Sequence, residues 1–220
     1  MIAIQAEGLH KTYDQAGTPV EVLKGLDLEV KAGETVAILG QSGSGKSTLL
    51  SLLAGLDAPT RGTVRLAERP IVGMSEAELA RFRARHLGIV FQQFHLMSYL
   101  SALENVRLPL EIARMPEASP GSRELLEKVG LAHRLDHLPS QLSGGEKQRV
   151  AIARAMIARP SCLLADEPSG NLDRRTGEEV MDLLFEQVRT SGMAMVLVTH
   201  NEALASRCDR KLALRDGRLA

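Results

Sequence analysis

Alternating apolar and polar positions dominate the first thirty residues. The segments IAIQAEGLHKTY and VEVLKGLDLEV both alternate, and a Gly/Pro turn at 16–19 separates them, which predicts two strands joined by a hairpin. The apolar run TVAILG at 35–40 ends at a glycine and predicts a buried strand. The next segment, KSTLLSLLAGL, has helical spacing. This part of the chain therefore predicts antiparallel strands followed by a strand–loop–helix unit.

The middle of the chain changes from strand-like to helix-like patterning. We expect a glycine-containing hairpin around 61–64, a helix at 76–86 and a strand at 87–92. From about 93 to 159 the pattern is mainly helical, and its breaks are Pro109, Pro116, Pro120 and Gly130.

Strand and helix patterns alternate again in the last third. Strands are expected at 161–166 and 193–200, with a helix at 176–190 between them and a short helix and strand afterwards. Such alternation on both sides of a helical stretch predicts one α/β domain over 1–220. Its core would comprise 1–92 and 160–220, and a helical subdomain would be inserted at 93–159.

Composition excludes several kinds of protein. Lys plus Arg and Asp plus Glu are both 27, so a non-specific nucleic-acid binder is not expected. Cys162 and Cys208 match neither a disulfide framework nor a metal-ligand spacing. No apolar run approaches the roughly 18 residues of a membrane span. If the protein works at a membrane, another chain must hold it there.

The segment GQSGSGKST at 40–48 fits the phosphate-loop pattern and lies between a predicted strand and a predicted helix. Backbone N–H groups of such a loop point at phosphate oxygens. Lys46 would reach the β- and γ-phosphates, and the Ser47 hydroxyl would bind Mg²⁺. The expected ATP-binding residues of this loop are Gly40, Gln41, Ser42, Gly43, Ser44, Gly45, Lys46, Ser47 and Thr48.

Two later strands end in polar residues. CLLADEP at 162–168 places Asp166 at the carboxyl end of the sheet as a metal-side acid, and Glu167 would orient the water that attacks the γ-phosphorus. The competing interpretation, a solvated acidic turn, is disfavoured by the apolar strand and the phosphate loop. His200 ends the next strand, where it could bind the γ-phosphate; a structural histidine is the alternative.

LSGGEKQR at 142–149 is a second Ser/Gly step that leads into a helix, and therefore a second place to hold an anion. One nucleotide does not need two such loops. The order of motifs along the chain addresses this redundancy: GQSGSGKST, FQ at 91–92, LSGGE, LLADEP, NLD at 171–173 and His200.

In this order the motifs resemble the ATP-binding subunit of an ABC transporter, over essentially the whole chain. The resemblance implies a P-loop NTPase core, with a mixed sheet and N-terminal antiparallel strands, and an inserted α-helical subdomain. It also implies an ATPase that uses ATP and Mg²⁺, and two copies that close head-to-tail around two ATP molecules. Ser143, Gly144 and Gly145 would then contact the γ-phosphate held by the other copy.

The resemblance assigns further residues. Gln92 would touch Mg²⁺ and the attacking water, and would link the core to the helical insert. Asp173 matches the loop acid that communicates between the two sites. Tyr13 resembles the aromatic residue that stacks on adenine, although a core or strand-surface tyrosine is a competing interpretation. Glu146 departs from the commonest residue of the family, glutamine, a variant that should not remove ATPase activity.

Several segments resemble the narrower group of LolD, MacB and YbbA ATPases, among them TYDQAGTPVEVLKGLDLEV and ADEPSGNLDRRTGEEVMDLL. HLPSQLSGGE and RCDRKLALRDGRL look most like YbbA. The partners implied are permeases with few spans and large extracytoplasmic domains, so the chain would be cytoplasmic and peripheral on the inner face of the membrane. The region 93–115 would receive the permease's coupling helix on an apolar patch that could instead pack internally: Phe94, Leu96, Met97, Tyr99 and Leu100.

Three functions remain open at this point. The leading one is an ATPase that drives a permease of the lipoprotein-release or macrolide-export type. The second is an FtsE-like regulator that is switched by ATP and moves no substrate. The third is the ATPase of a polar amino-acid importer. The ATPase residues do not separate the first two, because both would use the same dimer cycle.

Overall fold

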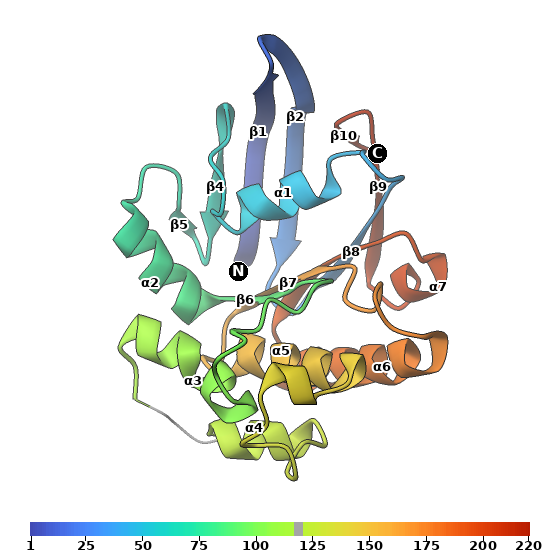
Figure 1. Ribbon diagram of the computed structural model, residues 1–220. Helices are drawn as coiled ribbons and strands as arrows, with labels where there is room; N and C mark the ends of the chain where they lie inside the picture. The colour runs from blue at the N-terminus through green and yellow to red at the C-terminus, as the bar shows by residue number, and fades with distance from the viewer. Residues whose placement is uncertain (117–120) are drawn as a thin grey trace.

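The computed structural model describes residues 1–116 and 121–220, and two β-sheets organise much of this part of the chain (Figure 1). The first sheet is four-stranded and antiparallel, with the order β2-β1-β4-β5. Its strands are β1 (Ile2–Gln15), β2 (Thr18–Lys31), β4 (Arg61–Leu66) and β5 (Arg69–Pro70). Ala16 and Gly17 form the expected hairpin turn and both have positive φ.

The second sheet is six-stranded, with the order β10-β9-β3-β8-β7-β6, and only β10 runs antiparallel to its neighbour. Its strands are β3 (Thr35–Leu39), β6 (Leu87–Val90), β7 (Cys162–Asp166), β8 (Ala194–Thr199), β9 (Arg210–Arg215) and β10 (Arg218–Leu219). The carboxyl ends of β3, β7 and β8 meet at one edge, where open α/β sheets bind ligands.

Helices cover both faces of the parallel sheet. They are α1 (Lys46–Leu53), α2 (Glu76–His86), α3 (Ala102–Ala113), α4 (Ser122–Lys128), α5 (Gly144–Met156), α6 (Arg174–Ser191) and α7 (Glu202–Ala205), with a 3₁₀ turn at Pro139–Gln141. In Figure 1 the hairpin and α1 lie above this sheet, and α5 and α6 lie below it. No helix in 1–116 or 121–220 is long and apolar enough to cross a membrane.

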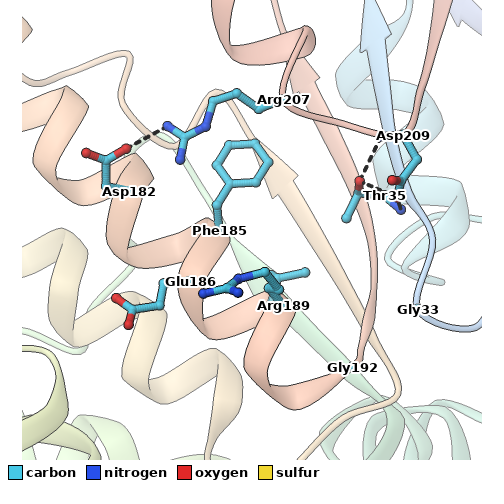
Figure 2. Close-up of a pocket in the computed structure, with 10 residues that line it drawn as sticks. Gly33, Thr35, Asp182, Phe185, Glu186, Arg189, Gly192, Arg207 and Asp209 are labelled. Atoms are coloured by element: carbon cyan, nitrogen blue, oxygen red, sulfur yellow. Dashed lines mark hydrogen bonds and ion pairs between the residues drawn. The ribbon is translucent and has the colours of Figure 1, made fainter.

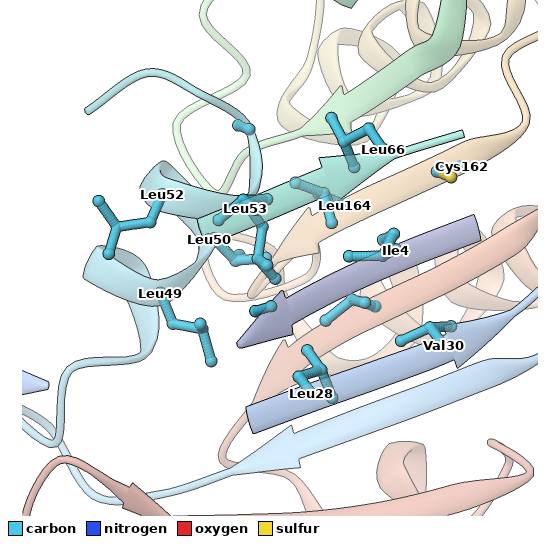
Figure 3. Packing of buried hydrophobic residues seen from close by; sticks show 14 of the residues in the cluster. Ile4, Leu28, Val30, Leu49, Leu50, Leu52, Leu53, Leu66, Cys162 and Leu164 are labelled. Atoms are coloured by element: carbon cyan, nitrogen blue, oxygen red, sulfur yellow. The ribbon is translucent and has the colours of Figure 1, made fainter. Parts of the chain in front are cut away.

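The largest apolar cluster lies between the two sheets (Figure 3). Leucines of α1 pack there against Ile4 of β1, Leu28 of β2 and Leu164 of β7. Because β7 and β8 are covered on both faces, their sequences read as continuous apolar runs. Cys162 is fully buried in this cluster and Cys208 is half-buried, and both are free thiols. This packing fixes α1, and with it the phosphate loop, against the sheet.

Two further apolar clusters lie on the other side of the parallel sheet, away from the antiparallel one. One joins α5 and α6 to the parallel sheet, and the other is enclosed mainly by α3, α4 and α5. The latter lies within 93–159, the range expected for the inserted subdomain.

Several boundaries differ from the expected ones. The β4–β5 hairpin turns at Ala67 and Glu68, both with positive φ, rather than at 61–64. Strand β6 ends at Val90, and β10 was not anticipated. Pro109 lies inside α3 instead of ending a helix. Pro120 falls outside the described residues.

Candidate nucleotide site

The phosphate loop connects β3 to α1 and depends on glycine where it meets the hairpin. Gly43 and Gly45 have φ of 81° and 100°, and Gly45 is the residue before the first turn of α1. A Cβ atom on Gly45 would lie 3.0 Å from Leu23 Cδ2 and 3.1 Å from Val22 Cγ1. A residue with a side chain at this position would be strained by the positive φ, and its Cβ would crowd Val22 and Leu23 of β2.

Lys46 and Ser44 supply polar side-chain groups that a ligand of the loop can bind. Lys46 is only 7% exposed, and its Nζ donates to Gly40 O at 2.8 Å and Gln41 O at 2.9 Å. Ser44 Oγ is buried and has no hydrogen-bond partner among the described residues. A buried hydroxyl without a partner costs free energy that a bound ligand can recover. The ammonium, this hydroxyl and the N-terminus of α1 together fit a polyphosphate.

Asp166 ends β7 beside the first turn of α1. Burial raises the pKa of Asp166, and the charge of Glu167 adds to this, whereas a hydrogen bond from Ser47 and the charge of Lys46 oppose it. Within 1–116 and 121–220 no three His, Cys, Asp or Glu side chains gather as a metal site. A hydroxyl and one carboxylate fit Mg²⁺, which takes oxygen ligands and usually completes its shell with water and phosphate.

Glu167 and His200 meet at the same edge of the sheet. Glu167 has a φ of 42°, and its N–H donates to Val198 O at 2.9 Å. Its Oε2 lies 3.0 Å from Nδ1 of His200, whose side chain is 70% exposed while that of Glu167 is 21% exposed. The carboxylate is thus the more buried member of this pair, and the imidazole is the more exposed one.

A cavity of about 590 Å³ collects most of the expected residues. Its lining comprises Val22, Ser42, Gly43, Gly45, Lys46, Ser47, Thr48, Gln92, Asp166, Glu167 and His200. The carboxylates and the loop therefore face one space, as their strand-end positions predict. The expected residues that do not line it are Tyr13, Gly40, Gln41, Ser44 and 143–145.

Gln92 is held by an amide partner that the sequence did not single out. Its Nε2 donates to Asn171 Oδ1 at 3.2 Å, and Asn171 Nδ2 donates to Gln92 O at 2.9 Å. Asp173, two residues further on, caps α6 by accepting from Thr176 N at 3.0 Å. The NLD stretch marks this loop, but only the folded chain shows that Asn171 fastens it to Gln92.

Ser143, Gly144 and Gly145 lie at the N-terminus of α5, away from the cavity. Ser143 Oγ accepts from Glu146 N at 3.2 Å, and Glu146 Oε2 accepts from Ser143 N at 2.7 Å, which is a reciprocal capping box. A Cβ on Gly145 would lie 2.5 Å from Thr176 Cγ2, so the loop packs tightly on α6.

Glu146 also pairs with Arg134, whose Nε lies 2.9 Å from Glu146 Oε1. The bond from the Ser143 backbone holds the pKa of Glu146 below its usual value, and bonds from the Ser143 side chain and Arg134 reinforce this against burial. The residue that departs from the commonest family glutamine is therefore built into the cap of α5.

Tyr13 lies on β1 and is 39% exposed. Its hydroxyl donates to Asp57 Oδ2 at 2.7 Å, and the Lys11 ammonium lies 4.6 Å from the centre of its ring. No periodicity or motif pointed to Asp57.

A second hollow of about 570 Å³ lies near the opposite end of β3, between α6 and the start of β9 (Figure 2). Arg207 donates to Asp182 at 2.8 Å and lies over the ring of Phe185 at 4.1 Å. Thr35 and Asp209 are joined by three hydrogen bonds, since Thr35 donates from its backbone N–H and its hydroxyl to Asp209 Oδ2, and Asp209 N donates to Thr35 Oγ1. These side chains are partners of one another, and no motif of the sequence assigns any of them a role.

The loop between β3 and α1, on a sheet with acids at its carboxyl edge, defines a P-loop nucleoside triphosphatase. Residues 23–170 match the family described as ABC transporter. The ABC transporter ATP-binding protein YbbA of Escherichia coli K12 is 51% identical over 218 residues, which cover 98% of this chain and 96% of YbbA. The lipoprotein-releasing system ATP-binding protein LolD of Bordetella pertussis is 52% identical over 219 residues, which cover 99% of this chain and 95% of LolD.

Comparison with solved structures gives the same family. The dimeric, post-hydrolysis state of the ATP-binding cassette MJ0796 bound to ADP and Pi has a TM-score of 0.89 and 40% identity, over 98% of this chain and 96% of that one. The chain therefore belongs to the ABC transporter family, in which it is an ATP-binding subunit and an ATPase.

Proposed function

We propose that this chain drives a membrane permease of the lipoprotein-release or macrolide-export type by binding and hydrolysing ATP at the edge formed by β3, β7 and β8. The observation that carries the proposal is the single cavity lined by Lys46, Asp166, Glu167 and His200. The full-length similarity to LolD supports the type of permease.

The phosphate loop binds the triphosphate. Backbone N–H groups of 42–47 and the α1 N-terminus donate to the phosphate oxygens, and Lys46 exchanges its two carbonyl partners for them. The buried Ser44 hydroxyl is available to the same ligand. Ser47, Asp166 and Gln92 hold Mg²⁺, which supplies positive charge against the phosphates.

Glu167 orients the water that attacks the γ-phosphorus. Its carboxylate accepts a hydrogen bond from the water, and positioning of this kind is the main demand of phosphoryl transfer. His200 donates from Nδ1 to Glu167 in the corresponding tautomer, so the imidazole fixes the carboxylate and presents its other nitrogen to the γ-phosphate side.

A second copy of the chain completes each site. The Ser143 hydroxyl uses a lone pair to accept from Glu146 N, so its hydrogen stays available to a phosphate oxygen on another copy. Gly144, Gly145 and the positive end of α5 add to this anion site. The dimeric MJ0796 cassettes support such an arrangement.

The permease binds the segment after Gln92. Met97 and Tyr99 are 38% and 74% exposed, whereas Phe94, Leu96 and Leu100 are half-buried. Tyr99 and Met97 therefore provide the apolar contact for a partner helix, and the other three residues support them from inside. This contact holds the subunit at the inner face of the membrane.

A trapped dimer tests the proposal. Glu167→Gln keeps the size of the side chain and removes the charge that orients the water, so the variant should bind MgATP normally and accumulate as a dimer in size-exclusion chromatography. Glu127→Gln, on the exposed face of α4, is the control and should not accumulate as a dimer in MgATP. A Glu167→Gln chain that remains monomeric in MgATP would contradict the assignment.

A further inference from the structure

Two side chains fix Tyr13 from different directions. Asp57 Oδ2 accepts from the Tyr13 hydroxyl at 2.7 Å, and Asp57 Oδ1 accepts from Lys11 Nζ at 2.7 Å. The same ammonium lies 4.6 Å from the centre of the Tyr13 ring, within the range of a cation–π contact. One ion pair therefore holds both the hydroxyl and the face of the ring.

This ion pair is partly removed from water. The side chains of Lys11 and Asp57 are 11% and 32% exposed, and Lys11 also donates to Ala58 O at 2.8 Å. Burial raises the pKa of Asp57, but hydrogen bonds from Lys11, Tyr13 and the Ala58 backbone outweigh it and hold the pKa below its usual value. The carboxylate is ionised at neutral pH, so it remains a strong acceptor for both partners.

The tether, by which we mean the Lys11–Asp57 ion pair and its hydrogen bond to Tyr13, also relates the ring to the phosphate loop. Asp57 follows α1, the helix that begins with Lys46 and Ser47. The side chain of Thr48, which lines the cavity, is close enough to the Tyr13 hydroxyl to oppose the rise of its pKa that burial and Asp57 cause. On the neighbouring strand, Val20 pairs with Tyr13 and is 38% exposed. The exposed ring thus has a fixed place beside the cavity rather than the freedom of a surface tyrosine.

We propose that Lys11 and Asp57 are positioning residues for Tyr13, which they hold where the adenine base stacks, and that they thereby favour ATP over a triphosphate without a base. This inference rests on the proposed function, because it requires that the cavity binds ATP. Neither residue touches the nucleotide; both act through the ring of Tyr13.

The test compares two ligands, MgATP and magnesium tripolyphosphate, by calorimetry on the purified full chain. The readout is the ratio of the tripolyphosphate Kd to the ATP Kd. Tyr13→Ala should lower this ratio on the order of tenfold, as expected for loss of one base–aromatic stack. Asp57→Ala should lower it several-fold with the tripolyphosphate Kd unchanged, and Asp57→Asn, which keeps an acceptor oxygen, should lower it less.

A double variant separates positioning from general stability. In the Tyr13→Ala background, Asp57→Ala should have no further effect on the ratio, because both changes remove the same stack. Equal losses of affinity for both ligands, or additive losses in the double variant, would overturn the proposal. Asp27→Ala is the matched control, since Asp27 also ties down β1, by accepting from Gly8 N at 2.6 Å, and should leave the ratio unchanged.

Two further variants give the test a result even if Asp57→Ala fails to fold, and they distinguish failure of the positioning role from failure of the nucleotide site. If Asp57→Ala does not fold, Tyr13→Phe removes only the hydroxyl, and an unchanged ratio would then reject the tether. Lys46→Ala should weaken both ligands together. Failure of that result would reject the nucleotide site itself, whereas failure of the ratio test alone rejects only the positioning role.

Discussion

Nδ1 of His200 lies 3.0 Å from Oε2 of Glu167, although the two residues are 33 positions apart in the chain. The contact follows from the parallel pairing of β7 with β8, which sets Asp166 opposite Val198 and brings the two strand ends together. A carboxylate that orients a water must itself be held still. In the proposed mechanism the imidazole provides this restraint.

His200→Ala should therefore lower kcat about 100-fold with a smaller change in KM, because the nucleotide stays bound while its water is poorly placed. Steady-state phosphate release measures both parameters. His133→Ala, at an exposed position, serves as the control. An unchanged kcat in the His200 variant would show that Glu167 needs no second side chain.

Ser143→Arg should leave nucleotide binding to the single chain nearly normal and abolish hydrolysis. The reason is that 143–145 lie outside the cavity of the same chain, while the larger cation blocks the approach of a second copy. Calorimetry and ATPase assays on the same preparation give the comparison. Loss of ATP binding by the monomer would count against the two-copy site.

Glu146→Gln should keep the α5 cap, since glutamine also completes a capping box, but lose the ion pair with Arg134. The pKa of Glu146 is lowered from its ordinary 4.5 in the folded chain, so its contribution to stability is present above pH 4.5 and is lost as the pH falls through the lower, folded value. Urea unfolding should show the variant about 0.5 kcal/mol less stable at pH 7, with the gap closing in acid, and ATPase activity retained. A gap that is the same at pH 7 and pH 3 would exclude the ion pair as its cause.

Arg154→Met should destabilise the segment after Gln92. The Arg154 guanidinium donates to the carbonyl oxygens of Phe94 and His95. These two residues have φ of 60° and 48°, which strains the backbone of the segment. Burial lowers the pKa of Arg154 to about 10. We expect a loss of about 2 kcal/mol in urea unfolding, faster amide exchange at 94–97 and lower kcat. Arg189→Met, at an exposed position, should change neither stability, amide exchange nor kcat. If both variants behave alike, the bonds from Arg154 to the 94–95 carbonyls have no role.

The motifs predicted the strand ends and the loop well, because phosphate chemistry demands specific residues at fixed spacing. Lys46, Asp166 and Glu167 were located from local patterns, and the parallel pairing of β3, β8 and β7 explains why they share one cavity. Local pattern and global topology agree there.

The partners of these residues could not be predicted in the same way. Asp57 and Asn171 reach Tyr13 and Gln92 across 44 and 79 positions, and neither contact leaves a periodicity in the sequence. Pro109 lies inside α3, where burial of the helix outweighs the lost backbone donor. Ala67 and Glu68 turn a hairpin with positive φ although glycine is the usual choice.

The two carbonyl bonds of Lys46 have a consequence for how the loop takes up its ligand. The ammonium has three N–H groups, and two of them donate to Gly40 O and Gln41 O. A phosphate oxygen can therefore accept the third N–H before either internal bond breaks. A polyphosphate has further oxygens for the other two, so the donors of Lys46 can pass from the loop to the ligand one at a time, and this buried ammonium keeps hydrogen-bond partners throughout.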